Sequence, residues 1–88
     1  MSVDDRQARI RPAFTTKQGE YLTFIHYYTV ILGRPPAEAD LQRYFRVSPP
    51  SVHQMVLTLE RFGFIERTPG APRSIRMLVD PDILPALR

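Results

Sequence analysis

Glycines and prolines divide this chain into short segments, and their positions constrain its fold more than any other feature. The breaks fall at residues 33–36 (Gly-Arg-Pro-Pro), at Ser48-Pro49 and at Gly63. Proline pushes the preceding residue out of helical geometry, serine is a preferred helix N-cap, and glycine often follows the last helical turn. Only short helices fit between these breaks. With 88 residues in all, the chain has room for one domain with one small core.

The first predicted helix begins after Thr15 and ends at Gly33. Thr15 and Gln18 have the spacing of a capping box, in which each side chain bonds the backbone N–H of the other. Apolar positions at helical spacing then follow over residues 20–32, namely Leu22, Ile25, Tyr28 and Leu32. Residues 1–13 show no such periodicity, so we predict a flexible basic arm there.

Two shorter helices are predicted after the first. One covers residues 37–45 and has Glu38 and Asp40 in its first turn, where the helix dipole favours negative charge. The other begins at Ser48-Pro49, and its apolar positions recur at i, i+3, i+4 and i+7, namely Val52, Met55, Val56 and Leu59. Phe62 extends this stripe, so we predict that it also faces the core.

The last third of the chain is typical of a β-hairpin. Strands are predicted over residues 64–67 and 74–79, joined by a loop over 68–73 that contains prolines and a glycine. Residues 80–88 form a tail with at most a short helix. Three short helices followed by a hairpin are the plan of a winged helix-turn-helix. We therefore predict a mainly α fold with a small β-hairpin, in which residues 14–79 form the domain.

Composition argues against several classes of protein. The chain has no cysteine and two separated histidines, so it offers neither disulfides nor a structural zinc site. No apolar run approaches the ~20 residues needed to cross a bilayer, and the charged N-terminus lacks the apolar stretch of a signal peptide. His26 has no nucleophile, acid or metal partner at a recognisable spacing. We predict a cytoplasmic protein that is not an enzyme and has no cofactor, membrane association or small-molecule substrate.

Arginine dominates the positive charge. The formal net charge is +3, and Lys17 is the only lysine. A guanidinium group binds phosphate or guanine in a bidentate manner, which favours a nucleic-acid partner. GC-rich coding also enriches arginine in any protein, so charge alone leaves both interpretations open.

Several segments together resemble the DNA-binding domain of the LexA repressor family in their order and spacing. They span residues 14–79 and include Phe14 to Glu20, Gly33 to Pro36, Ser48-Pro49, Gly63 to Arg67 and Pro69 to Arg76. The resemblance implies a winged helix-turn-helix whose third helix enters the major groove of an operator. The family's peptidase and dimerisation domain uses a serine–lysine dyad, and Lys17 is the only lysine here. We therefore expect a standalone DNA-binding domain without self-cleavage.

This chain departs from the family pattern in the region that reads DNA. The turn before Ser48 is one residue shorter than usual and has Arg46 where a glycine is typical. Ala37 stands where the family usually has a capping threonine. His53 and Gln54 fall where LexA has acidic residues, so we expect a different operator.

The resemblance and the helical angle select the same face of the third helix as the DNA-binding site, together with the turn before it and the wing. The predicted contact residues are Ser48, Pro50, Ser51, His53, Gln54, Leu57, Arg46, Arg67 and Arg73. Gln54 suits adenine, with about 1–3 kcal/mol of discrimination, and Leu57 suits a thymine methyl group. Arg73 suits phosphate or a narrow minor groove. The alternative is a solvated helix face, with wing arginines that pair with Glu66 or keep the strand edge soluble.

The consecutive prolines Pro49 and Pro50 remove two backbone donors from the start of the third helix. Helix N-termini usually offer such N–H groups to phosphate. We therefore expect weak anion binding by this backbone. The hydroxyl groups of Ser48 and Ser51, together with nearby arginines, would position the helix instead.

The leading functional hypothesis is sequence-specific binding of double-stranded DNA, as a transcriptional repressor or regulator. The alternative is a protein-interaction module, because one helix face cannot bury all of Val30-Ile31-Leu32. Leu57 and Ile83-Leu84 would extend that apolar surface. The same run could mediate a homodimer, which a lone domain needs in order to read a symmetric operator. RNA binding is disfavoured because the aromatic residues have core spacing.

Overall fold

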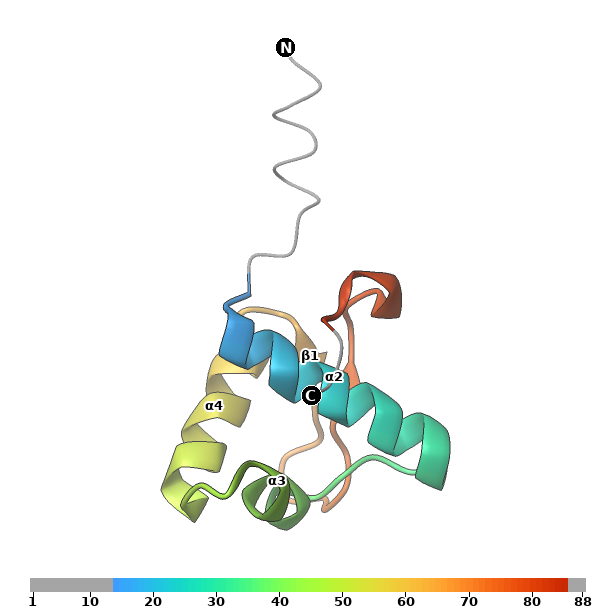
Figure 1. Cartoon of the computed structure of the whole chain (residues 1–88). Helices are drawn as coiled ribbons and strands as arrows, with labels where there is room; N and C mark the ends of the chain where they lie inside the picture. The colour runs from blue at the N-terminus through green and yellow to red at the C-terminus, as the bar shows by residue number, and fades with distance from the viewer. Residues whose placement is uncertain (1–13, 86–88) are drawn as a thin grey trace.

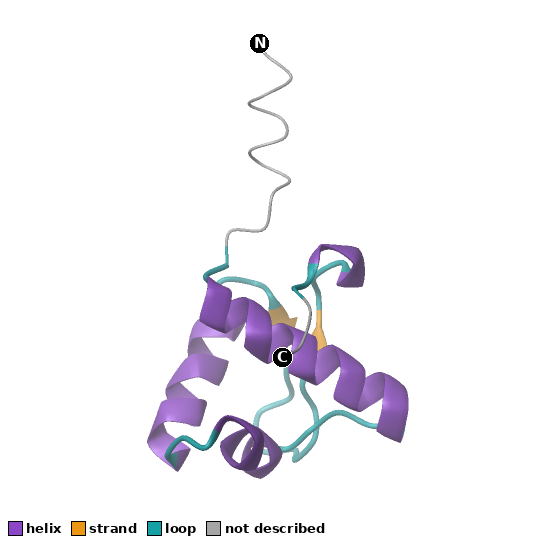
Figure 2. Ribbon diagram, in the orientation of Figure 1, coloured by secondary structure: helices purple, strands orange, loops and turns teal. Residues whose placement is uncertain are grey.

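The computed structural model describes residues 14–85, which form three helices and a small two-stranded sheet (Figures 1 and 2). In chain order the elements are α2 (Thr16–Leu32), α3 (Glu38–Phe45), α4 (Pro49–Arg61), β1 (Ile65–Glu66), β2 (Arg76–Met77) and the 3-10 helix η1 (Pro81–Ile83). The strands are antiparallel neighbours. The predicted fold class, a mainly α winged helix-turn-helix with a small hairpin, is confirmed. The predicted arm over residues 1–13 lies outside the described residues.

Both ends of α2 lie where the sequence predicts them. The Thr15 hydroxyl accepts a hydrogen bond from the Gln18 backbone N–H at 3.1 Å, and the Gln18 side chain accepts from the Thr15 backbone N–H at 2.9 Å. This is the predicted capping box. Gly33 ends the helix with φ at 76°, in the left-handed region that favours glycine.

The two helices of the helix-turn-helix begin differently. Ser48 caps α4 by accepting from the Ser51 backbone N–H at 3.3 Å, as predicted. Ala37 has no side-chain oxygen to cap α3. The Asp40 carboxylate partly compensates, because it accepts from the Ala37 backbone N–H at 2.8 Å. Arg46 ends α3 with φ at 56°, a left-handed conformation for a residue other than glycine.

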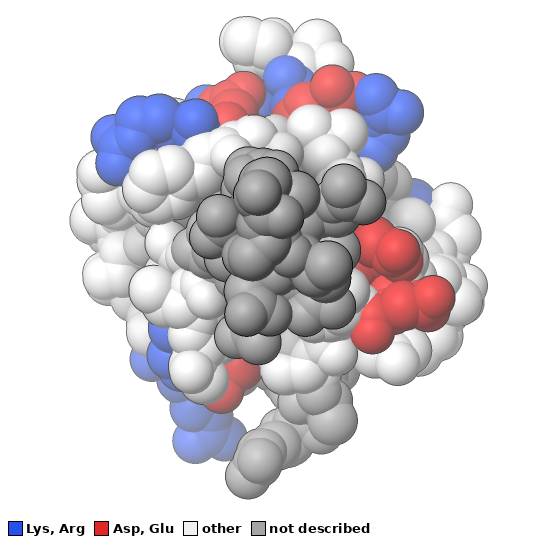
Figure 3. All heavy atoms as spheres, turned by 90° about the horizontal axis from the view of Figure 1, so that it is seen from above, with Lys and Arg blue, Asp and Glu red and all other residues white. Residues whose placement is uncertain are grey.

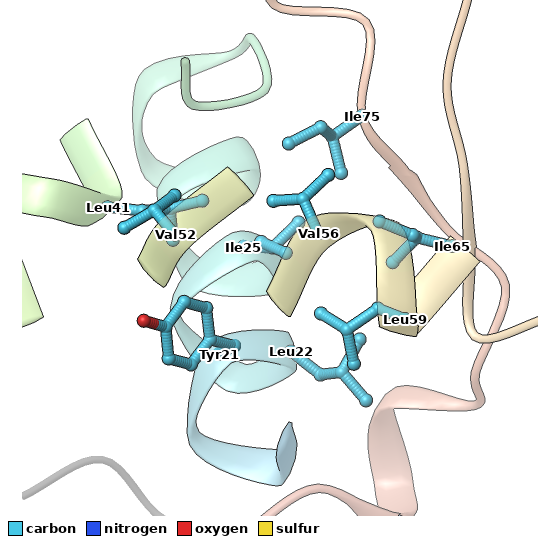
Figure 4. Close-up of a cluster of buried hydrophobic side chains, with 9 residues drawn as sticks. All are labelled: Tyr21, Leu22, Ile25, Leu41, Val52, Val56, Leu59, Ile65 and Ile75. Atoms are coloured by element: carbon cyan, nitrogen blue, oxygen red, sulfur yellow. The ribbon is translucent and has the colours of Figure 1, made fainter. Parts of the chain in front are cut away.

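The core is a single cluster of nine buried side chains contributed by the three helices and the hairpin (Figure 4). It comprises Tyr21, Leu22, Ile25, Leu41, Val52, Val56, Leu59, Ile65 and Ile75. Fully burying one such aliphatic side chain stabilises a fold by about 1.5–3 kcal/mol. The Tyr21 ring also stacks on Phe45, with 4.1 Å between ring centroids. The predicted stripe of α4 therefore faces the core, with Met55 packed against it at half burial.

Two predicted positions differ in the structure. Phe62, predicted to face the core, is 55% exposed, because α4 ends at Arg61 and Gly63 then turns the chain with φ at 80°. Leu57, predicted to be exposed, is half-buried.

The hairpin is shorter than predicted. Its ladder contains two residue pairs, Ile65 with Met77 and Glu66 with Arg76. The intervening loop contains prolines, which lack the N–H that a ladder needs. Arg73 in that loop has φ at 55°, outside extended geometry. We call residues 67–75 the wing loop.

The C-terminal tail packs against α2. The Thr23 hydroxyl donates to the Pro85 carbonyl oxygen at 2.8 Å. A Cβ atom at Gly19 would lie 2.9 Å from Phe14 and 3.1 Å from Pro85, so glycine permits this close approach. Over residues 80–85, the described part of the tail, the one helix is the short η1, as predicted. Among the described residues, no helix combines the length and apolarity that spanning a membrane requires.

Candidate nucleic-acid interface

The elements predicted to meet DNA lie at one end of the molecule. Figure 1 shows the amino-terminal end of α4, the short helix α3 and the loop between the two strands together at the lower end. A hollow of about 330 Å3 lies between the start of α3 and the wing loop, lined by residues 36–38 and 70–75. The upper face, seen in Figure 3, has basic and acidic side chains interspersed around its rim. The lower end is the candidate interface because the start of α4, helix α3 and the loop between the strands meet there.

One face of α4 presents five of the predicted contact residues to solvent. These are Ser48, Pro50, Ser51, His53 and Gln54, which we call the reading face. The other side of the same helix buries Val52, Val56 and Leu59 completely. The core therefore fixes how the helix is rotated, and that rotation leaves the reading face open.

The serines of the reading face already hydrogen bond to each other. The Ser48 hydroxyl lies 3.0 Å from the Ser51 hydroxyl and also accepts from the Ser51 backbone N–H. Pro49 and Pro50 occupy the first two helical positions and have no N–H. The first backbone donor of α4 is therefore already engaged, which leaves hydroxyl groups rather than the helix N-terminus for phosphate contact.

His53 is held in place by a residue of α3. Its Nδ1 lies 3.2 Å from both carboxylate oxygens of Glu38, and the side chains of His53 and Glu38 are 53% and 30% exposed. A carboxylate accepts hydrogen bonds, so a neutral His53 carries its proton on Nδ1. Nε2 then presents an acceptor, and it has no hydrogen-bond partner within residues 14–85. That atom suits the amino group of cytosine or adenine.

Arg73 has a different environment from the one predicted. Its Nη1 lies 3.1 Å from the Tyr28 hydroxyl, 3.3 Å from the Pro35 carbonyl oxygen and 3.0 Å from Asp40 Oδ2. A phosphate contact by this nitrogen would have to displace these bonds. Through Nη1, Arg73 therefore connects the wing loop to the helices, and its predicted contact with DNA stays a prediction.

Asp40 is the centre of that connection. It is buried, and it accepts from the Ala37 backbone, from Arg73 and from Arg43. Burial by itself raises the pKa of the Asp40 carboxyl group. Hydrogen bonds from Ala37 and Tyr28, together with the charges of Arg73 and Arg43, outweigh burial and hold that pKa below its usual value. Asp40 is therefore a charged buried group that joins α3 to the wing loop.

The other two predicted arginines differ in availability. Arg67 is half-buried, and its Nε donates to Glu60 at 3.1 Å. Arg46 is exposed in the turn between α3 and α4, next to the reading face in sequence. Arg76 pairs with Glu66 across the strands, which is the alternative considered for wing arginines. Arg46 is thus the most accessible of the predicted arginines.

Residues 12–74 match the LexA DNA binding domain, and this match covers most of the chain. The chain belongs to the LexA DNA-binding domain family. This confirms the resemblance found in the sequence.

Individual LexA relatives match over the same region. The chain is 36% identical over 63 residues to the LexA repressor of Thermotoga neapolitana, covering 72% of this chain and 32% of that protein. It is 35% identical over 68 residues to the LexA repressor of Thermosipho africanus, covering 77% and 34% respectively. It is 36% identical over 70 residues to that of Mannheimia succiniciproducens, covering 77% and 32%. The chain therefore spans about a third of the length of these LexA repressors.

Sequence reasoning missed three residues that shape this LexA-type site. The sequence assigns Glu38 only a favourable interaction with the helix dipole, but its carboxylate also contacts His53 Nδ1. It assigns Asp40 the same interaction with the dipole and Tyr28 an apolar position of the first helix. In the structure both side chains bind Arg73. These contacts join residues 15 to 45 positions apart. Local spacing carries no signal at that range, although a carboxylate so close to the core does call for a cationic partner.

Proposed function

We propose that this chain binds double-stranded DNA sequence-specifically and acts as a transcriptional repressor or regulator. The reading face of α4 enters the major groove, and the wing loop lies against the DNA backbone or minor groove. One observation carries the proposal. The reading face is exposed and mostly polar, whereas the opposite side of the same helix is fully buried. Membership of the LexA DNA-binding domain family supports it, as does the repressor name of the matched relatives.

Each part of the interface has a defined role in this proposal. Gln54 pairs with an adenine edge, and His53 accepts through Nε2 from a base amino group. Ser48 and Ser51 position α4 against phosphate, and Arg46 supplies charge in the adjoining turn. Leu57 is half-buried, so its contact with a thymine methyl group would be limited to its exposed part.

The proposal includes a homodimer on a two-fold symmetric operator. A single helix-turn-helix reads one half-site, and two copies are needed to read a symmetric pair. A DNA-binding role also requires that the chain share a compartment with the DNA, and we propose that this compartment is the cytoplasm. The role is binding and regulation rather than catalysis.

The test is selection of bound duplexes from a randomised DNA library, followed by affinity measurements across salt concentrations. We expect an enriched motif and a salt slope of about −0.9 for each phosphate contact. Salt-sensitive binding without any enriched motif would contradict sequence-specific regulation. No binding at low salt would contradict DNA binding altogether and favour the protein-interaction module.

Gln54→Ala tests the base-reading role directly. We expect it to relax the preference at one position of the motif, at a cost of about 1–3 kcal/mol on the preferred sequence. Gln42→Ala makes the same change on α3 and serves as the matched control, which should keep the preference of the unmodified chain. An equal loss on every sequence for Gln54→Ala would remove this residue from the base readers.

A further inference from the structure

A second exposed surface lies away from the reading face. Large apolar side chains emerge from the second half of α2 and from α3: Tyr27 is 46% exposed, Ile31 74%, Leu32 55% and Tyr44 42%. Together with Phe24 and Tyr28 they line a hollow of about 240 Å3. We call these six residues the α2–α3 apolar surface.

This surface is a second apolar side of a helix that already buries a first one. Leu22 and Ile25 of α2 face the core and are fully buried. Tyr27 and Ile31 are four residues apart, so they share a different face of the same helix. A surface helix normally has one apolar stripe and a polar opposite face. Helix α2 therefore has an apolar side that the described fold leaves in solvent.

We infer that the α2–α3 apolar surface is a dimer interface occupied by the same surface of a second copy of this chain. The inference rests on the proposed function, because it identifies the partner with which the chain would read a symmetric operator. Three observations support a second copy, and they concern area, charge and position.

The first observation is the area. Aromatic side chains bury about 150–250 Å2 each and aliphatic ones roughly 60–120 Å2. The exposed parts of the two tyrosines and two aliphatic side chains therefore present on the order of 300 Å2 of apolar area. A stable interface buries about 800 Å2 per partner, and in homodimers about 65% of that is apolar, or roughly 500 Å2. The α2–α3 apolar surface supplies most of the apolar centre that such a dimer needs.

The second observation is the charge. All six residues of the hollow are aliphatic or aromatic, with no acidic or basic side chain among them. A two-fold interface brings the same residues of both copies together, so any charge on the axis would meet its like. An uncharged surface avoids this repulsion. A strongly charged partner, by contrast, would have no counter-charge to meet in the hollow.

The third observation is the position. The hollow is lined by α2 and α3 only, and neither α4 nor the wing loop contributes to it. Two copies can therefore meet through this surface and keep both reading faces open. The structure thus separates the surface that would join two copies from the surface that would meet DNA.

The test is sedimentation equilibrium of the whole chain without DNA, over a series of concentrations. We expect a monomer–dimer equilibrium that Ile31→Lys weakens by about tenfold or more, the effect of losing one well-buried interface residue. Val30→Lys is the matched control. Val30 is the neighbouring residue and is 63% exposed, yet it does not line the hollow. It should leave the association constant within about twofold, since residues outside an interface contribute little.

Leu32→Lys provides a second variant on the same surface, and circular dichroism checks that every variant is folded. A wild-type chain that stays monomeric at all concentrations would overturn the inference, including the case in which a different protein covers the surface. So would a dimer that Ile31→Lys and Leu32→Lys leave unchanged. Because association is measured without DNA, a failure of the dimer and a failure of DNA binding give separate results.

Discussion

At the scale of single residues, Arg46 combines a functional position with an unfavourable backbone conformation. It ends α3 with φ at 56° and ψ at 49°, in the left-handed region that favours glycine. A side chain in the left-handed conformation costs roughly 1–2 kcal/mol, and glycine avoids that cost. An arginine at this exposed position places a positive charge beside the reading face.

The substitutions Arg46→Gly and Arg46→Ala separate backbone from charge. We expect Arg46→Gly to raise the free energy of unfolding by about 0.5–1 kcal/mol, because strain is relieved while the glycine adds chain entropy. Arg46→Ala keeps the strain and should give no such gain. Both remove one phosphate contact and should lower the salt slope of DNA binding by about 1. Equal stability for the two variants in urea titrations would refute the strain argument.

At the scale of elements, the contact between the wing loop and α3 depends on the ion pair between the half-buried Arg73 and the buried Asp40 rather than on the strands. The ladder has two residue pairs, whereas Arg73 binds Asp40 of α3, Tyr28 of α2 and the Pro35 carbonyl oxygen. The wing is therefore positioned mainly from the helical side.

The substitutions Arg73→Ala and Arg76→Ala test which arginine contributes more to stability. Arg73 joins the wing loop to the helices, whereas Arg76 forms an exposed pair. Arg73→Ala should lower the free energy of unfolding by more than Arg76→Ala does, because it removes a charged hydrogen-bond donor from the buried Asp40 carboxylate. Arg76→Ala breaks an exposed pair with Glu66, and such pairs contribute about 0–1 kcal/mol. Urea denaturation of both variants is the measurement. A loss for Arg73→Ala no larger than that for Arg76→Ala would mean that the wing does not depend on this contact.

At the scale of the whole molecule, Asp40 links global stability to pH. The pKa of its carboxyl group is lowered in the folded chain, so the folded state favours the charged form. That stabilisation is fully present above the unfolded value of about 3.9 and is lost as pH falls through the lower folded pKa. We expect Asp40→Asn to be less stable than the unmodified chain at neutral pH and to lose less stability on acidification. Thermal unfolding as a function of pH measures both effects, and parallel pH curves for the two chains would contradict them.

At the same scale, the two surfaces for which roles are proposed lie on different parts of the molecule. The reading face of α4 is exposed at one end, and the α2–α3 apolar surface lies on other elements. The surface proposed for DNA and the surface proposed for a second copy therefore do not overlap. The two variants Gln54→Ala and Ile31→Lys should therefore affect base preference and association separately.

The helices and their ends follow from local signals, because caps, breaks and apolar spacing act within a few residues of one another. The capping box at Thr15, the glycine end at Gly33 and the Ser48-Pro49 start of α4 all lie where these local signals predict. The burial of Val52, Val56 and Leu59 followed from their period alone, which also predicted the outward face of α4.

Which charged and apolar side chains meet depends on how the elements pack in the folded chain. Arg73 bonds Asp40, and His53 bonds Glu38, because packing brings together residues far apart in the sequence. Phe62 left the core because the helix ends one residue before it. Local sequence patterns report energies between near neighbours, whereas these outcomes depend on distances that exist only after the chain has folded.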